Sequence, residues 1–397
     1  MTGTATTLAR VEFAGTAAVH FLFAALTLGL LPVVAVLQTR WTRSGAPDLE
    51  RMTKYWGNLY VINYALGIIT GLVMEFQFGL NWSGLPHTVG NLFGAPLALE
   101  TIIAFFAEST LLGLWILGWG RIPEKAHLAL IWLVTLTAYF STFFIMVANG
   151  FMQHPVGYAT RNGTIVLKSW GALLTNSGMF YGLIHLVFGA LTTGGFFIAG
   201  VSAYHLARNT GEKEFFRRSL WIGLILGGVA SLATVGLGYA QYGYLKSAQP
   251  AKYATMTGKP VSGPAPPDWI STPLNVMLGI GIILVAVALA AVLFREQFLR
   301  SRIVLWGLVV LIPLPFLALV CGWLVREVGR QPWIVYGLVR TTQAASPAST
   351  AAVLLSLIAF SAIYIALAAV DYQLIARAAK RGPRDDIFGE IEVEVAA

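Results

Sequence analysis

The chain has 397 residues, of which 57% are hydrophobic and only 11% are charged. A soluble domain carries roughly 25% charged residues, so the composition excludes a soluble protein and indicates a chain embedded in lipid. The net charge of +8 does not indicate a nucleic-acid partner, because the basic residues lie between apolar runs rather than in one patch. The single cysteine, Cys321, excludes a disulfide framework and a CxxCH motif for covalent haem.

Nine apolar runs reach the length of about 20 residues that a membrane-spanning helix needs. The pattern therefore predicts an all-α polytopic membrane protein, with one membrane domain over residues 1–397. The first run has no basic segment before it and no obvious processing site, so we expect a retained helix rather than a signal peptide. The predicted spans cover residues 12–38, 56–78, 95–119, 127–149, 178–207, 219–243, 271–294, 303–325 and 350–376.

The distribution of basic residues predicts how these spans are oriented. With the N-terminus outside, the segments on the inner side hold 17 of the 26 Lys and Arg residues, as the positive-inside rule requires. We therefore expect an N-terminus outside and a cytoplasmic C-terminus, with residues 377–397 forming a cytoplasmic tail. The longer loops, at about 150–177, 244–270 and 326–349, then lie outside.

Six residues with metal-binding or acid–base chemistry fall in or beside five of the predicted spans. In this orientation all of them lie in the outer half of the membrane or at its outer edge, although they come from different helices. They are His20, Glu100, Glu108, His185, Met277 and Glu327.

Glu100 and Glu108 are the least easily explained of this set. A charged side chain at the bilayer centre costs at least about 2.5–3.5 kcal/mol on insertion scales, and such residues usually mark proton relays or ion pathways. Eight residues separate them by about 80° around an α-helix, so they share a broad face. Each histidine taken alone could instead hydrogen-bond a neighbouring helix, and Met277 taken alone is better explained by packing.

Two classes of function remain open on this evidence. A proton- or ion-coupled transporter would place its site near the membrane midplane between internal repeats. A haem-bearing redox protein would use imidazole, thioether and carboxylate side chains at or beside the iron. The absence of a repeat and the clustering in the outer half favour the redox protein.

Several segments resemble the signature segments of subunit I of the cytochrome bd oxidases, over about residues 8–245 and 270–340. The resemblance implies a subunit of a respiratory oxidase that reduces oxygen to water with cytoplasmic protons, in a bacterial or archaeal plasma (inner) membrane. It also implies a homologous membrane subunit II and allows small single-helix subunits. The segments are "TAAVHFLFAALTLGLLPVV", "MTKYWGNLYVINYALGIITGLVMEFQFGLNWS", "FGAPLALETIIAFFAEST", "VANGFMQHP" and "CGWLVREVGRQPW".

The same resemblance implies three haems and assigns their ligands. His185 and Met277 match the axial ligands of a low-spin haem b. His20 and Glu327 match the axial ligands of two high-spin haems, of which one is a haem b and the other is a haem d or b. Which of the two high-spin haems lies on His20 stays open.

Further positions match residues that surround the haems or carry protons. Glu100 matches the acid beside the oxygen-reducing centre, and Glu108 matches a buried acid on the proton path. Ser109 and Ser141 match hydroxyl groups along the same path. Trp323 and Arg330 match residues packed against the haems, Arg330 as a partner of a haem propionate.

The sequence departs from the family pattern on the side of the electron donor and at the proton entrance. The loop at 244–270, which is a long quinol-binding excursion in the family, is short here. Lys252 matches a lysine linked to quinol oxidation, but the acid expected five residues later is Thr257. The arginine expected before the methionine ligand is Asn275, and the acid expected at the inner end of the third span is Gly120.

The electron donor is therefore left open between quinol and a cytochrome c. The three lysines of the loop, Lys246, Lys252 and Lys259, predict an outer surface that could attract an acidic redox protein. The alternative functions are a haem b electron-transfer subunit with another acceptor and, less favoured, a proton-coupled transporter.

Overall fold

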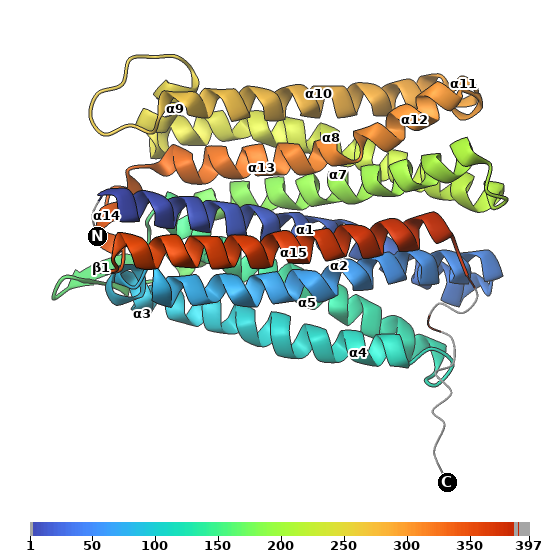
Figure 1. Ribbon diagram of the computed structural model, residues 1–397, viewed down its shortest axis with the longest axis horizontal. Helices are drawn as coiled ribbons and strands as arrows, with labels where there is room; N and C mark the ends of the chain where they lie inside the picture. The colour runs from blue at the N-terminus through green and yellow to red at the C-terminus, as the bar shows by residue number, and fades with distance from the viewer. Residues whose placement is uncertain (1–2, 385–387, 389–397) are drawn as a thin grey trace, which may run out of the picture.

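The structure is a computed structural model that describes residues 3–384 and 388. Within them, nine helical spans are long and apolar enough to cross a membrane, which confirms the predicted all-α polytopic fold. The helices run side by side as one bundle (Figure 1). The predicted tail falls largely outside the described residues, at 385–387 and 389–397. The spans are Gly3–Ser44, Pro47–Leu80, Gly84–Leu117, Glu124–Gln153, Trp170–Arg208, Lys213–Ala248, Asp268–Leu293, Arg302–Arg330 and Thr350–Arg381.

Five of these spans each consist of one continuous helix, and the other four are divided into shorter elements. The undivided ones are α1 (Gly3–Ser44), α2 (Pro47–Leu80), α5 (Glu124–Gln153), α8 (Lys213–Ala248) and α15 (Thr350–Arg381). The third span consists of α3 (Gly84–Thr101), the π-helix η1 (Ile102–Glu108) and α4 (Ser109–Leu117). The remaining spans contain α6 (Trp170–Leu174), α7 (Ser177–Arg208), η2 (Asp268–Ile270), α10 (Ser271–Leu293), α12 (Arg302–Leu311), α13 (Pro313–Glu327) and η3 (Val328–Arg330). The connections contain α9 (Pro250–Met256), α11 (Arg295–Arg300), α14 (Thr341–Ala344), β3 (Trp333–Val335) and β4 (Val339–Arg340).

The third span begins at Gly84, earlier than the residue 95 at which its apolar run begins. The extra turns contain Gly, His, Thr and Asn, which lower the hydropathy without preventing a helix. Pro86 lies in the first turn, where a missing N–H costs nothing. The start of α3 lies close to α14, since a Cβ added at Gly84 would be 2.6 Å from the Gln343 carbonyl oxygen.

A small β-hairpin occupies the loop between α5 and α6. Strands β1 (Tyr158–Arg161) and β2 (Thr164–Leu167) pair antiparallel, with Arg161 opposite Thr164. The two turn residues, Asn162 and Gly163, both have positive φ angles, of 49° and 78°. Asn-Gly is the preferred pair for such a two-residue turn, so the sequence contained a signal for this hairpin.

The centre of the bundle is a close crossing of α1 and α7. At Gly29 of α1, an added Cβ would collide with the Ala190 carbonyl oxygen and lie 2.8 Å from the Gly194 nitrogen of α7. On the next face of α7, a Cβ at Gly195 would similarly meet the backbone of Gly227 in α8. Small residues let membrane helices approach closely and gain van der Waals contact. These glycines therefore hold α1, α7 and α8 as a compact block.

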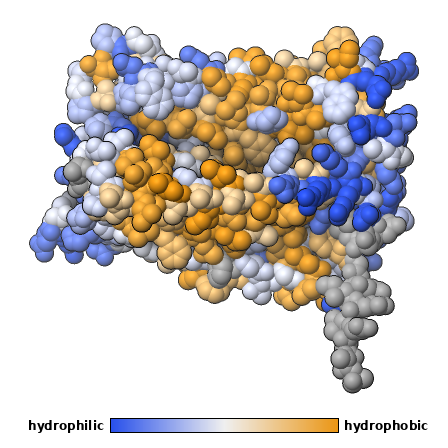
Figure 2. All heavy atoms as spheres, in the orientation of Figure 1, coloured by the Kyte–Doolittle hydropathy of each residue, from blue (hydrophilic) through white to orange (hydrophobic). Residues whose placement is uncertain are grey.

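The two ends of the bundle differ in composition from its middle. Figure 2 shows a band of hydrophobic residues across this face, with hydrophilic residues toward both ends, as expected for a protein that crosses a bilayer. The end that carries the N-terminus, α9 and β1 is called the α9 end here, and the opposite end, with the α1–α2 and α7–α8 turns, is called the Glu212 end (Figure 1).

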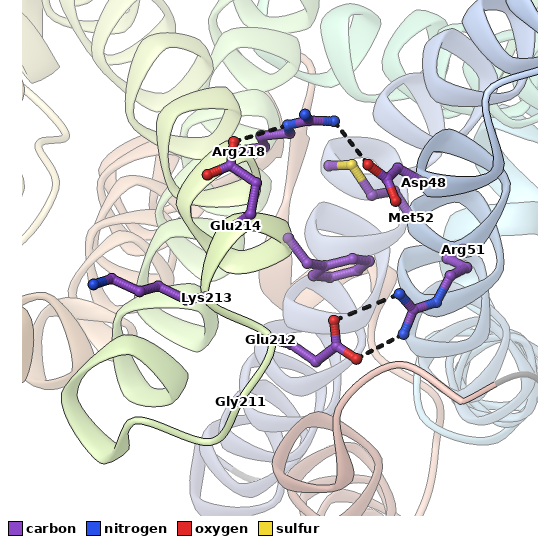
Figure 3. A pocket seen from close by; sticks show the side chains of 9 residues that line it. Asp48, Arg51, Met52, Gly211, Glu212, Lys213, Glu214 and Arg218 are labelled. Atoms are coloured by element: carbon purple, nitrogen blue, oxygen red, sulfur yellow. Dashed lines mark hydrogen bonds and ion pairs between the residues drawn. The ribbon is translucent and has the colours of Figure 1, made fainter.

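Ion pairs tie the two turns together at the Glu212 end. Arg51 of α2 pairs with Glu212 at 2.7 Å, and Arg218 of α8 pairs with both Asp48 and Glu214 at 3.1 Å. These side chains surround a small polar pocket of about 170 Å³ (Figure 3). Half-exposed pairs contribute little each, so their main effect is to fix how α2 and α8 align.

Candidate functional site

A cavity of about 640 Å³ lies between α1, α2, the third span, α5 and α13. It brings together residues that are up to about 300 positions apart in the sequence. The predicted site residues that line it are His20, Glu100, Glu108, Ser141, Trp323, Glu327 and Arg330. The other four predicted site residues, Ser109, His185, Lys252 and Met277, are not among its lining residues.

His20 is held in place on the cavity wall by α2. Its Nδ1 lies 3.0 Å from the Thr70 hydroxyl oxygen, and that hydroxyl donates to the Gly67 carbonyl at 2.7 Å. The ring also lies against Gly71, where an added Cβ would be 3.0 Å from the imidazole. A hydrogen bond at one ring nitrogen fixes the orientation of a ligand histidine, which leaves Nε2 as the candidate ligand atom.

Glu327, at the C-terminus of α13, accepts hydrogen bonds from two side chains of α5. Its Oε1 accepts from Asn149 at 2.8 Å and from Gln153 at 3.3 Å, and its Oε2 pairs with Arg330 at 2.7 Å. An ionised carboxylate offers about four acceptor sites, so this one keeps capacity for a further partner.

Arg330 and Trp323 complete this side of the cavity. Arg330 is buried, and its Nη1 has no hydrogen-bond partner among the residues that the structure describes. A buried guanidinium nitrogen without a partner is costly unless a ligand satisfies it. Trp323 packs against Phe21 of α1, with ring centroids 5.8 Å apart. The side therefore combines an aromatic wall with a cationic donor, which suits the flat ring and the carboxylates of a haem.

A second carboxyl group, which the sequence did not lead us to propose, lies beside Glu100. Glu100 accepts a hydrogen bond from Ser141 at 3.0 Å, and the Glu75 carboxyl group of α2 is close enough to interact with it electrostatically. Glu75 accepts from Thr101 at 3.1 Å. Two neighbouring carboxyl groups in one cavity disfavour each other's ionised form, so this pair is suited to hold a proton. Helical spacing could have indicated Glu75, since it lies one turn beyond Gly71 on the face that meets His20.

Glu108 lies deeper, at the end of the π-helix. Its side chain is only 3% exposed, and its Oε1 has no hydrogen-bond partner in the described part of the chain. The prediction of an 80° separation from Glu100 assumed a continuous α-helix, whereas η1 occupies Ile102–Glu108. A π-helix has more residues per turn, and such segments occur frequently at functional sites. The wider turn changes the direction of Glu108, and both carboxyl groups line the same cavity.

His185 and Met277 lie outside this cavity, among α7, α8, α10 and α13. The Nδ1 of His185 is buried and lacks a hydrogen-bond partner among the described residues. Gly238 of α8 faces its ring, where an added Cβ would be 3.4 Å from the imidazole. A Cβ at Gly322 of α13 would be 3.0 Å from the Met277 sulfur. Both side chains thus lie directly against glycines of neighbouring helices, where a larger residue would displace them.

Two other histidines of the membrane helices are also buried. His127 and His205 are 3% and 2% exposed. His127 bonds Gln38 at 2.9 Å and the Trp115 carbonyl at 2.7 Å, and both nitrogens of His205 are also hydrogen-bonded. With both ring nitrogens engaged, these histidines have no free ligand atom and serve packing.

Lys252 also differs from its prediction as an exposed docking lysine. It is 4% exposed, donates from Nζ to the Arg326 carbonyl at 3.3 Å, and lies against Gly329. Burial, with a smaller contribution from the nearby Arg326 guanidinium, lowers the pKa of Lys252 to about 7. The short α9 helix therefore inserts this lysine beneath the surface, next to the segment that carries Glu327.

We expect this burial to be measurable as a pH dependence of stability. In the folded protein Lys252 loses its proton near pH 7, whereas in the unfolded chain it keeps the proton up to about its ordinary pKa of 10.5. Between these values the unfolded state binds more protons, so the free energy of unfolding rises with pH. The Lys252→Met variant should show a smaller rise in apparent unfolding temperature between pH 7 and 9 than the wild type. Lys246→Met, which changes an exposed lysine, should retain the wild-type rise, and an identical rise in both variants would contradict the burial of Lys252.

Comparison with known proteins decides the family. A family model described as cytochrome bd terminal oxidase subunit I matches residues 8–273 and 264–383, nearly the whole chain. The chain belongs to this family. It is therefore a subunit of a respiratory terminal oxidase, an oxygen-reducing oxidoreductase of the prokaryotic membrane, as the signature segments predicted.

Individual relatives agree with this assignment. The chain is 36% identical to cytochrome bd ubiquinol oxidase subunit 1 of Bacillus subtilis (strain 168) over 449 residues, covering 97% of this chain and 96% of the relative. It is 41% identical to cytochrome bd-II ubiquinol oxidase subunit 1 of Escherichia coli (strain K12) over 261 residues, 65% of this chain and 51% of that one. The fold matches the bd oxidase structure from Geobacillus thermodenitrificans with a TM-score of 0.88 at 25% identity, covering 96% of this chain and all of that one.

Haem is the cofactor of this family, and the residues of this chain fit it. The cavity offers an oriented imidazole at His20, a carboxylate with spare acceptor capacity at Glu327, and an unsatisfied guanidinium nitrogen at Arg330. His185 offers a buried nitrogen without a partner, beside a glycine of α8. Imidazole, thioether and carboxylate are groups that ligate or surround haem iron.

Proposed function

We propose that this chain is the haem-bearing catalytic subunit of a cytochrome bd-like oxidase that reduces oxygen to water with protons from the cytoplasm. The observation that carries the proposal is the single cavity in which His20, Glu327 and the Glu100–Glu75 pair meet. It places metal-ligating side chains and a proton-holding pair side by side, which oxygen reduction requires. Family membership removes the reason to consider a transporter.

In this proposal three haems bind the chain. His185 and Met277 hold a low-spin haem b, which has no open position and so only transfers electrons. His20 and Glu327 each hold a high-spin haem, one of them haem b and the other haem d or b. Bound haem supplies the electron path and the iron that oxygen binds, and Arg330 holds a propionate through its free Nη1.

Protons reach this centre from the Glu212 end through a series of protonatable groups. This end is cytoplasmic in the proposed orientation, which has the N-terminus outside. Glu108 lies nearer that end, and its proton passes to the Glu100–Glu75 pair beside His20. Ser141, which donates to Glu100 at 3.0 Å, and Ser109, which lies 3.4 Å from the Tyr64 hydroxyl oxygen, position the path.

We further propose a quinol as electron donor, in place of the cytochrome c that the loop lysines suggested. The relatives in Bacillus subtilis and Escherichia coli are named ubiquinol oxidases. Only Lys246 and Lys259 of the three lysines are exposed, so the basic surface is weaker than expected. Near Lys252 at the α9 end, buried polar atoms of His154, Tyr244 and Gln249 lack partners among the described residues, which suits a polar headgroup.

We also propose that the loop at 244–270 is a shortened form of the family's quinol-binding loop. The alignment with the first Bacillus subtilis relative covers 449 positions, more than the 397 residues of this chain, so that relative has segments which this chain lacks.

The partners proposed for the complex are a homologous membrane subunit II, small single-helix subunits and the surrounding lipid, with no nucleic acid.

The absorption spectrum of the purified complex, oxidised and dithionite-reduced, tests the proposal. We expect a low-spin haem b and high-spin haem bands in the wild type, and conversion of the low-spin haem to high spin in Met277→Leu, which keeps the packing volume. Oxygen uptake with a reduced short-chain quinol should be rapid and insensitive to salt. An absence of haem would contradict the proposed function, and an unchanged low-spin spectrum in Met277→Leu would exclude Met277 as a ligand.

A further inference from the structure

The buried carboxyl group of Glu108 needs a source of protons. Glu108 lies nine residues before the end of α4, or roughly 13 Å at 1.5 Å per residue. The family pattern places an acid at the inner end of this span, but the residue there is Gly120, whose φ of +69° belongs to a tight turn. The proton entrance of this chain must therefore use other groups, an inference that rests on the proposed function.

Tyr60 and Tyr64 lie on α2, on the face that packs against the third span near Glu108. They are four residues apart and so share one face of α2, with ring centroids 5.9 Å apart. The Tyr64 hydroxyl oxygen lies 3.4 Å from the Ser109 oxygen, which places Tyr64 level with the end of the π-helix. Tyr64 and Glu108 both line the cavity.

Packing of α2 on α4 places Tyr60 one turn closer to the Glu212 end. At Gly57, one turn before Tyr60, an added Cβ would be 2.7 Å from the indole ring of Trp115. On α2, Gly57 lies seven residues before Tyr64, and on the third span Trp115 lies seven residues after Glu108. These equal separations show that α2 and the third span run antiparallel with these positions level. Tyr60 therefore lies between the level of Glu108 and the level of Trp115.

Tyr60 and Glu108 share an unusual property. The Tyr60 hydroxyl oxygen and Glu108 Oε1 are both buried, and neither has a hydrogen-bond partner among the residues that the structure describes. Both tyrosine hydroxyls are close enough to Glu108 to interact with it electrostatically. A buried unsatisfied polar group costs about 1–3 kcal/mol, whereas a buried water with two to four polar partners satisfies such groups.

We propose that Tyr60 and Tyr64 hold water beside Glu108, and that the Tyr60 hydroxyl relays protons to it from the Glu212 end. In each transfer the hydroxyl gives its proton to the Glu108 carboxylate and takes one from a protonated water on its other side, which received that proton from the solvent at the Glu212 end and is left as neutral water. The tyrosine ends each transfer neutral and unchanged, and the net result is one proton moved to Glu108. The two tyrosines act through Glu108 and so are positioning residues, which compensate for the missing acid at Gly120.

The test is oxygen reduction by the complete complex carrying Tyr60→Phe or Tyr64→Phe. Phenylalanine keeps the ring packing and removes only the hydroxyl. We expect Tyr60→Phe to slow steady-state oxygen uptake roughly tenfold, the lower range for loss of a proton-transferring group, and to raise the solvent deuterium isotope effect. The haem spectrum and the anaerobic reduction of the haems by the donor should be unchanged, because electron transfer does not use these hydroxyls.

Tyr55→Phe is the matched control, because Tyr55 lies on the same helix and is as deeply buried. Its hydroxyl donates to the Ala379 carbonyl at 2.8 Å and does not face Glu108. This variant should keep the wild-type turnover and isotope effect while losing some stability. If Tyr60→Phe instead kept the wild-type turnover and isotope effect and only gained stability, the hydroxyl would be a packing group and the relay would be wrong.

The outcome separates the relay from the proposed function. Oxygen uptake and a haem spectrum in the wild-type complex, together with full turnover in Tyr60→Phe, would overturn the relay alone. A wild-type complex without haem or without oxygen uptake would overturn the proposed function and the relay with it. A tenfold loss in Tyr60→Phe with Tyr55→Phe unaffected supports both.

Discussion

Replacing His20 by leucine should abolish oxygen reduction while leaving the helix bundle folded. Leucine fills part of the volume against Gly71 but offers no ligand atom, so the haem that we propose binds at His20 would lose its ligand there. We expect oxygen uptake to fall roughly a thousandfold or more, the scale seen when an essential catalytic group is removed. The haem-to-protein ratio should fall by one high-spin haem, and the low-spin spectrum from His185 and Met277 should persist.

His205→Gln is the control for this prediction. His205 is also buried in a membrane helix, but its two ring nitrogens bond Thr210 at 2.8 Å and the Ala379 carbonyl at 2.7 Å. Its loss should lower stability by about 1–3 kcal/mol, the range for broken buried hydrogen bonds, and leave haem content and oxygen uptake intact. If His20→Leu retained full haem content and activity, His20 would not be a haem ligand.

Replacing Glu100 by glutamine should slow oxygen reduction about a hundredfold, the range for loss of a general acid or base. Glutamine has the same shape and can still accept the Ser141 hydrogen bond, but it cannot take up or release a proton as we propose that Glu100 does. The haem spectrum should be unchanged. Oxygen uptake and the spectrum of the same preparation together separate loss of proton transfer from loss of haem.

Glu12→Gln provides the matched control for Glu100. Glu12 of α1 is 1% exposed and accepts from Asn81 at 2.8 Å and Ser356 at 2.7 Å, outside the cavity lining. A buried carboxylate of this kind fixes helix contacts, so the variant should be less stable but fully active. Equal losses of activity in Glu12→Gln and Glu100→Gln would show a general effect of removing buried acids rather than a proton path.

The fold could be predicted from the sequence because membrane spans depend on local composition. The nine apolar runs correspond to the nine spans of the described residues, but several helices begin before their apolar run, as α1 does at Gly3, α2 at Pro47 and α3 at Gly84. The Asn162-Gly163 turn carried a local signal as well, although we drew no prediction from it.

The sequence predicted the site residues that stand out individually, but not those whose role depends on contacts with distant residues. His20, Glu100 and Glu108 were identifiable because a histidine or acid in lipid is costly. The burial of Lys252 was not, because it depends on a carbonyl 74 residues away in the chain. The burial of His127 could not be predicted for the same reason, since its partner Gln38 is 89 residues away.

Glu75 and the π-helix were missed for a different reason. Glu75 lay inside a segment that identified the family, and its pairing with Glu100 follows from how α2 meets the third span. The π-helix alters the hydrogen-bond register of Ile102–Glu108 without any change of composition that we could detect. The sequence therefore identified which residues carry the chemistry but did not show in which direction their side chains point from the helix.

The glycine crossing of α1 and α7 has a consequence for biosynthesis. Helices enter the membrane in chain order and then associate, yet Gly29 of the first span meets Gly194 of the fifth. These two spans are also the most buried of the nine within the described residues. The nascent chain must therefore keep its first helix in lipid, with its closest contact surface unpaired, until four more helices have been inserted. The ribosome will have translated about half of the protein before its centre can close, so assembly of the bundle is necessarily late.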